Sequence, residues 1–311
     1  MWDNCSHGQA ISVRWAGAWP DAASGGSQYN IGYRTPAALG RNVALPHTNV
    51  TKYLCGAFNS GAANTGSDVM CWVEFVKGTY PYYSYWCWYE RVDPLWVFNG
   101  TPGSMNFKTY GISTGTGTIY NLPDNWYLEY RSNDFDSAGA TPSWHSNSDA
   151  VPTDQGLDPP VNYGNDAPNP TSQWVKHEVL MKWSDQASGG YIKVWSNNAV
   201  MLNVTAKTDG IVGTDRSEGI GGYSDMRGAD NWRYFSDMYH DRQSANPGRF
   251  MLANNATYAS ATIVEPQAYT SWASTSVAVV CNKGALSSGT VHLHYRDEVN
   301  GHQYLGTRTI A

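Results

Sequence analysis

The clearest alternation of apolar and polar positions in this chain runs from Trp174 to Trp183. His177 falls on the side that carries valine and methionine, and Glu178 falls on the side that carries the lysines. A period of two predicts a half-buried β-strand. Two more strands are predicted at Tyr191–Trp195 and Val200–Val204, joined by an Asn-Asn turn that tolerates positive φ. We expect these three strands to form the centre of an antiparallel sheet.

A second segment, Tyr82–Val92, carries aromatic residues on both of its alternating faces. Such a pattern is typical of a central strand that is covered on both sides, and one side could be core while the other lines a ligand groove. Shorter alternating runs predict further strands at Val69–Val76, Asn106–Ser113, Asn125–Asn133, Asn231–Arg242, Gly248–Asn255, Ala261–Gln267, Thr275–Gly284 and Thr290–Gly301.

Two long segments, 134–172 and 208–231, are rich in Pro, Gly, Asn, Asp and Ser and show little periodicity. We interpret both as long polar loops, and the first is expected to be functional, as a lid or a groove wall, or mobile. No stretch shows a clear helical period, and many short strands separated by turn residues favour an all-β sandwich or barrel. The domains expected are a β-sandwich over 1–267 and a small C-terminal β appendage over 268–311.

Composition narrows the choice of partner. The 311 residues include 14 Trp and 21 Tyr, enough to fill a core and still present aromatic faces to sugars. The net charge of -6 and the lack of a basic run argue against nucleic acid. No apolar run is long enough to span a membrane. The five cysteines show no CxxC spacing, which argues against a zinc site.

Several segments together resemble a known fold family. They are the aromatic strand YYSYWCWYERVDPLW, the NFK at 106–108, WVKHEVLMKW with GGYIKVWSNN, NWRYFSDMYHDR, and the segment from Arg249 to Val277. Their order is similar to concanavalin A-like lectin/glucanase jelly rolls, and more specifically to the polysaccharide-lyase-like, heparinase-like and LamG-like branch of bacterial and phage proteins. The resemblance implies a jelly-roll β-sandwich followed by a small β appendage. This fold hosts lectins, hydrolases, lyases and structural domains.

The catalytic signatures of well-known relatives are missing, since the chain has no E-x-D-x-x-E, R-T-E-x-R or Q-I-H strand motif. A lyase acting on uronate polymers must neutralise a carboxylate, abstract a proton and protonate the leaving oxygen. Tyr127, Arg131 and His177 are the candidate catalytic residues. The competing interpretation is cross-strand salt bridging by Arg131 and a hydrogen-bonded core role for His177.

Candidate ligand-binding residues are Trp86, Trp88, Glu129, Arg233 and Tyr239. The two tryptophans could stack on a sugar ring, although core burial is the competing interpretation because tryptophan is highly buried on average. A hydrolase would need two facing carboxylates, for which Glu129 and Glu178 could serve, but no signature spacing supports that pair.

No organic cofactor is implied by any motif. Asp134 and Asp136 lie two apart in an acidic loop and could bind Ca²⁺, with solvated turn acids as the ordinary alternative.

Three functions remain open at the level of sequence. The preferred one is glycan recognition or an architectural role in an extracellular or virion-associated assembly. The second is a polysaccharide lyase that cleaves uronate polymers by β-elimination in a concave groove. The third is a structural subunit that self-assembles through β edges, for which the strand-like C-terminus His302–Ala311 is the candidate.

Overall fold

A computed structural model describes the chain over 2–3, 32–34, 43–49, 53–58, 69–75, 83–92, 107–114, 125–131, 143–148, 162–163, 173–184, 189–206, 216–224, 231–243, 248–273, 275–298 and 301–311. These residues form an all-β protein, as the sequence predicts, and their one helical piece is the 3-10 turn η3 (Tyr258–Ser260). The strands assemble into three antiparallel sheets.

The largest sheet has eight strands in the order β12-β11-β10-β5-β14-β3-β2, with β1 paired to β14. Its strands are β1 (Trp2–Asp3), β2 (Gly32–Arg34), β3 (Tyr53–Phe58), β5 (Tyr83–Val92), β10 (Val175–Lys182), β11 (Gly190–Ser196), β12 (Ala199–Ala206) and β14 (Asn231–Gln243).

The second sheet has six strands in the order β4-β13-β6-β7-β8-β9. They are β4 (Val69–Phe75), β6 (Phe107–Thr114), β7 (Asn125–Arg131), β8 (Ser143–Ser148), β9 (Asn162–Tyr163) and β13 (Arg216–Ser224). The third sheet has five strands in the order β17-β16-β15-β18-β19, namely β15 (Arg249–Ala253), β16 (Val264–Trp272), β17 (Val277–Val280), β18 (Gly289–Arg296) and β19 (Gln303–Ile310).

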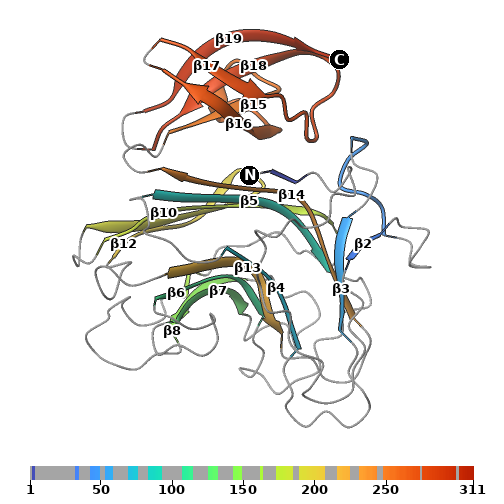
Figure 1. Cartoon of the computed structure of the whole chain (residues 1–311), viewed down its shortest axis with the longest axis vertical. Coiled ribbons are helices and arrows are strands. Elements are labelled where there is room, and N and C mark those ends of the chain that lie inside the picture. Colours follow the sequence, from blue (N-terminus) through green and yellow to red (C-terminus); the bar gives the residue numbers. More distant parts are fainter. Residues whose placement is uncertain are drawn as a thin grey trace.

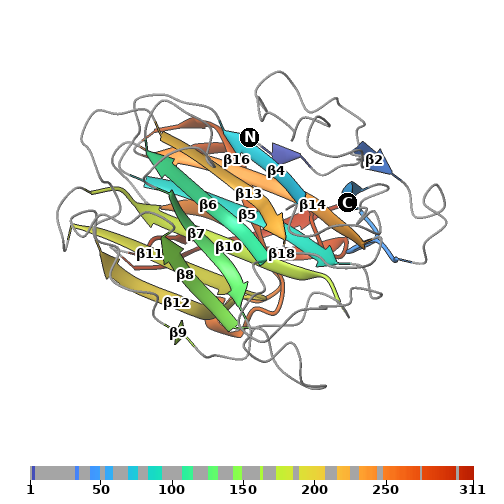
Figure 2. The ribbon, with the colours of Figure 1, turned by 90° about the horizontal axis from the view of Figure 1, so that it is seen from below.

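The three sheets are stacked as layers, with the eight-stranded sheet in the middle (Figure 1). The six-stranded sheet covers one of its faces, and strands of the two sheets run in similar directions when viewed from below (Figure 2). Such aligned packing of two curled antiparallel sheets is the architecture of a jelly-roll sandwich. The C-terminal sheet lies on the opposite side of the middle layer.

Strand β5 shows how the sequence specifies this layering. Trp86 and Trp88 are 0% exposed, and their rings lie 6.3 and 6.5 Å from that of Tyr110 in the six-stranded sheet. Tyr85 and Tyr89, which alternate with these tryptophans, contact Arg249 and Glu265 of the C-terminal sheet. The expectation of a central strand covered on both sides is therefore confirmed. The face that could have lined a ligand groove is covered by the C-terminal sheet.

The three strands of the central hairpin form as predicted, and the turn between β11 and β12 has φ of 48° at Asn197 and 66° at Asn198. Their predicted place at the centre of the sheet is wrong, because β12 is an edge strand and β5 and β14 occupy the middle. Local alternation fixes the hairpin, whereas the position of a hairpin within a sheet depends on pairing with distant strands.

The positive φ at Asn198 supports a prediction about stability. Asn198→Val should lower the free energy of unfolding by about 1–2 kcal/mol more than Asn198→Gly, because a β-branched residue is strained in the left-handed region. Both substitutions remove the same hydrogen bond, from Asn198 Nδ2 to the Thr262 carbonyl, so their difference isolates the backbone. Urea unfolding of the two variants measures it, and equal midpoints would contradict the argument.

Both segments interpreted as long loops contain strands, which corrects the sequence prediction. Strand β13 lies within 208–231 and pairs with both β4 and β6, and strands β8 and β9 lie within 134–172. The sequence of β13, RSEGIGGYS, is rich in glycine and serine, which have low strand propensity. Pairing on both sides overrides that propensity.

The pairing also bears on the predicted boundary at 267/268. Strands β15 and β16 begin at Arg249 and Val264, on the sandwich side of that boundary, yet both pair within the C-terminal sheet. Alternation in RFMLA and VEPQ marks strands without identifying the sheet they join. The division into two folding units at residue 267 stays a prediction.

Candidate functional site

His177, Trp86 and Trp88 all lie in the core between the two sandwich sheets. His177 is 0% exposed, its Nδ1 lies 3.0 Å from Ser196 Oγ, and its ring lies 5.3 Å from that of Trp88. Trp86 stacks on His240 with ring centroids 4.1 Å apart. The structure thus places these three candidates where they fill the core, in agreement with the competing interpretation weighed for each.

Tyr239, a candidate ligand-binding residue, lies on the other face of the eight-stranded sheet. It is 3% exposed and packs in a cluster with Tyr85, Cys87, Leu180 and Trp195, beneath the C-terminal sheet. It is therefore separated from His177 by the thickness of the sheet. Arg233 belongs to β14 and pairs with Val92 and Gly56.

The remaining candidates occupy the second sheet. Tyr110 of β6 is buried against the middle sheet and pairs with Leu128 of β7, so Leu128 shares its inner face. Because consecutive residues of a strand alternate between faces, Tyr127, Glu129 and Arg131 belong to the opposite face, which we call the outer face. This face is turned away from the middle sheet.

Two rows of positions cross this outer face. In one row Glu129 pairs with Lys108 of β6 and with His145 of β8. In the other row Tyr127 pairs with Gly111 of β6 and Asn147 of β8.

The second row extends toward β4 through two glycines. Gly219 of β13 pairs with Gly111 on one side and with Glu74 on the other. In this row β6 and β13 carry glycine and therefore contribute no side chain beside Tyr127. The neighbouring positions carry amide, phenol, imidazole and charged groups. Sequence reasoning found Tyr127, Glu129 and Arg131 but missed His145 and Asn147, because their strand lay within a segment interpreted as a loop.

The proposed metal ligands Asp134 and Asp136 lie outside the described residues. Within the residues that the structure does describe, no group of three or more His, Cys, Asp or Glu side chains is arranged to hold a metal ion. Over the same part of the chain, no helix is long and apolar enough to cross a membrane.

A second concentration of ionisable groups lies between the middle sheet and the C-terminal sheet. Glu178 of β10 accepts hydrogen bonds from Tyr85 Oη at 2.6 Å and from Arg296 Nη1 at 2.9 Å. Lys176 Nζ lies 3.8 Å and Arg249 Nη2 lies 4.0 Å from the same carboxylate. Two strands of the C-terminal sheet thus send arginines onto one buried glutamate of the sandwich.

The pKa of Glu178 reflects these neighbours. Burial alone would raise the pKa, but Arg296, Lys176 and Arg249 outweigh burial and lower it to about 2. Lys176 is also buried, and although desolvation would lower its pKa, Glu178, Glu265 and the other neighbouring groups together outweigh that cost and raise it. Both groups are therefore charged at neutral pH.

Two further acids complete this junction. Glu298 lies 2.6 Å from Arg296 Nε and 3.7 Å from both Arg249 and Lys193. Glu265 accepts a hydrogen bond of 2.7 Å from Tyr89, and burial raises its pKa. Arg249 lies near Glu178 and Glu298.

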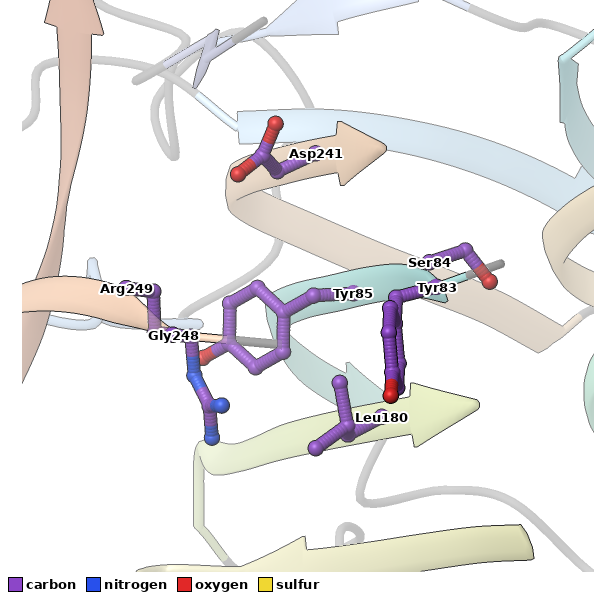
Figure 3. A pocket seen from close by; sticks show the side chains of 7 residues that line it. All are labelled: Tyr83, Ser84, Tyr85, Leu180, Asp241, Gly248 and Arg249. Carbon is purple, nitrogen blue, oxygen red and sulfur yellow. The ribbon is translucent and has the colours of Figure 1, made fainter. Parts of the chain in front are cut away.

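One small pocket opens at the rim of the junction, where Tyr85 and Arg249 lie side by side (Figure 3). It holds about 200 Å³ of empty space, some of it open solvent. The guanidinium of Arg249 lies 4.1 Å from the centre of the Tyr85 ring. These contacts and the matched charges make the junction a structural attachment between the sandwich and the C-terminal sheet.

Comparison with solved structures finds likenesses across most of the chain. An endo-β-1,4-glucuronan lyase from the fungus Trichoderma reesei matches with a TM-score of 0.49 at 14% identity, covering 79% of this chain and 96% of that one. An alginate lyase, Aly36B, matches with a TM-score of 0.44 at 11% identity over 68% and 94% of the two chains. An alginate lyase from Chlorella virus matches with a TM-score of 0.40 at 12% identity over 64% and 88%. These neighbours include polysaccharide lyases of jelly-roll fold, the branch that the sequence resembles. No protein-family model and no curated protein matches the sequence.

Proposed function

We propose that this protein binds an acidic polysaccharide across the outer face of the six-stranded sheet and cleaves it by β-elimination. The observation that supports the proposal is the register of β7 and β8, which sets Tyr127 beside Asn147 and Glu129 beside His145. Directly opposite positions have Cβ atoms about 4.5–5.5 Å apart and diagonal ones about 7–8 Å apart. Tyr127 and His145 are therefore within reach of one sugar residue.

Each step of β-elimination has a candidate group on this face. Asn147 and Arg131 are suited to neutralise the uronate carboxylate, which makes the C5 proton more acidic. Tyr127 and His145 are suited to remove that proton and to protonate the leaving glycosidic oxygen. The C4–O bond breaks as a C4–C5 double bond forms, so one product carries an unsaturated sugar and no water is consumed.

The glycines beside Tyr127 support a role in binding a chain. Gly111 and Gly219 offer a sugar polymer a strip of backbone free of side chains, with Glu74 beyond it. Strands β6, β7 and β13 arch so that their concave side is turned away from the middle sheet (Figure 1). Such a concave surface fits an extended polymer better than a flat surface would.

Tyr127→Phe should lower the turnover of a uronate polymer by at least about 100-fold, because the phenol can no longer transfer a proton. The measurement follows the ultraviolet absorbance of unsaturated products on a panel that includes glucuronan and alginate. Tyr295→Phe is the matched control, since that ring packs on Phe250 in the C-terminal sheet. A Tyr127→Phe protein as active as wild type would refute the assigned role.

Recognition without cleavage is the alternative. Wild-type protein that is retained on a glycan array but yields no unsaturated product from any polymer would support it over the lyase. The extracellular or virion-associated location stays a prediction in either case.

Self-assembly through β edges also stays a prediction, for which β19 is the candidate because it is an edge strand of the C-terminal sheet. Light scattering at high protein concentration tests it, and a clean monomer would count against it.

A further inference from the structure

Five rings follow one another across one face of the C-terminal sheet. The ring of Tyr258 lies 5.0 Å from that of His302, in a stacked arrangement, and 5.4 Å from that of His294. Tyr304 follows, with its ring 5.3 Å from His294 and 5.9 Å from His292. We call this group the ring platform.

The platform has a buried floor and an exposed edge. His294 is 2% exposed and its Nε2 lies 3.0 Å from the Asn255 carbonyl oxygen. Tyr304 is 49% exposed, and its hydroxyl lies 3.2 Å from His292 Nδ1. His302 is also exposed. The rings are thus held in place from below while two of them remain open to a ligand.

Contacts with the junction fix the platform relative to the rest of the molecule. The guanidinium of Arg296 lies 5.3 Å from the centre of the Tyr258 ring and 4.2 Å from that of Trp195 in β11. Arg296 also forms an ion pair with Glu178 of the middle sheet. A ligand on the platform would therefore be held at a set distance from the outer face of the six-stranded sheet, which lies on the far side of the middle layer (Figure 1).

The chemistry of the platform selects its ligand. Aromatic faces pack against the C–H groups of a pyranose ring, and the Tyr304 hydroxyl and imidazole nitrogens at the edge can hydrogen-bond to its hydroxyls. One side of the His302 ring is covered by Tyr258, and this partial desolvation lowers its pKa, so the imidazole is mostly neutral at pH 7 and does not form a cationic site for an anion. The described residues also hold no metal-binding group of three or more His, Cys, Asp or Glu side chains here.

We propose that the ring platform is a second carbohydrate-binding site, which holds a sugar residue of a polysaccharide against Tyr304 and His302. Binding at this site does not depend on catalysis at the six-stranded sheet. Its effect would be to keep a polymer attached to the protein while a different stretch of chain reaches the outer face.

Affinity electrophoresis of the full chain in gels that contain one polysaccharide each, neutral or acidic, tests the proposal. Tyr304→Ala and His302→Ala together should weaken the retardation by roughly tenfold, which corresponds to about 1.4 kcal/mol for the two rings together. Leu305→Ala is the matched control, because Leu305 is 39% exposed and is the next residue of the same strand. It should leave retardation unchanged.

Both variants change exposed side chains, so their thermal midpoints should stay close to that of wild type. Adding both platform substitutions to a Tyr127→Phe protein separates this site from the proposed activity. Tyr127→Phe should lower product formation by at least about 100-fold, and the platform substitutions should still weaken retardation in that background. Retardation of the Tyr304→Ala, His302→Ala protein equal to that of wild type would overturn the proposal. So would a wild-type protein that no polysaccharide in the panel retards.

Discussion

Replacing Glu178 by glutamine will lower the free energy of unfolding by roughly 3–5 kcal/mol at neutral pH, the cost typical of breaking a buried charge network. The side chain of Glu178 is 1% exposed and lies within 4.0 Å of Lys176, Arg249 and Arg296. Glutamine keeps the shape and one acceptor but removes the charge. Lys176, Arg249 and Arg296 then lose the buried carboxylate that they share, and of these three Glu298 still contacts only the two arginines.

Glu298→Gln is the matched control for this experiment. Glu298 contacts the same two arginines, but its side chain is 13% exposed and water can take over part of its role. We expect a loss of about 1 kcal/mol or less. Denaturant unfolding followed by tryptophan fluorescence gives both values, and hydrogen exchange in β16 and β18 reports whether the C-terminal sheet loosens first. Equal losses for the two variants would sink the assignment of Glu178 as the centre of the junction.

The same comparison predicts a pH dependence. A carboxyl whose pKa is lowered from 4.5 to about 2 in the folded state contributes stability that is fully present above pH 4.5. That contribution declines as pH falls toward 2, where the folded form also becomes protonated. The gap in stability between wild type and Glu178→Gln should therefore be widest above pH 4.5 and narrow below it. A gap that stays constant down to pH 2 would contradict the charge argument.

Strong local alternation predicted the strands that carry most of the fold. The hairpin from β10 to β12 and the two-faced strand β5 are where the sequence places them. The two arginines that cover the second face of β5 could not be predicted to do so. Arg296 is 118 residues from Glu178 in the chain, and nothing local links them. The sequence therefore allowed a ligand groove on the second face of β5, whereas in the structure this face forms the interface with the C-terminal sheet.

The candidate site was harder to predict than the fold for a related reason. Tyr127, Glu129 and Arg131 stand in a recognisable strand, but their neighbours lie in strands without a strong pattern. His145 and Asn147 come from SWHSNS, and Gly219 comes from RSEGIGGYS, both rich in small polar residues or glycine. A strand near a ligand gains from such residues, since small side chains leave space, and the same residues remove the alternation by which strands are found.

His177 illustrates what alternation settles and what it leaves open. The period of two correctly set His177 and Glu178 on opposite faces of β10. Which face of β10 belongs to the core depends on the other sheets, and in this structure both faces of β10 are covered. The hydrogen-bonded contact with Ser196 and the ring contact with Trp88 give His177 a packing role.

Shortening Trp86 to alanine will cost about 3–5 kcal/mol of unfolding free energy, because the removed ring fills space between the two sandwich sheets. Trp86 is 0% exposed, stacks on His240 of the same sheet and meets Tyr110 of the facing sheet edge to face. Its loss leaves a cavity bounded by both layers. Trp86→Phe keeps an aromatic ring there and should cost less than half as much.

Glycan retention, measured on the same variants, decides whether Trp86 is a core residue or stacks on a sugar ring. A residue of the core changes retention only as far as it changes the folded fraction, so Trp86→Phe should bind like wild type under conditions where it is fully folded. A ligand-stacking residue would lose affinity without losing stability. A Trp86→Ala protein that unfolds at the wild-type denaturant midpoint yet no longer binds polysaccharide would therefore return Trp86 to the binding surface and contradict its place in the core.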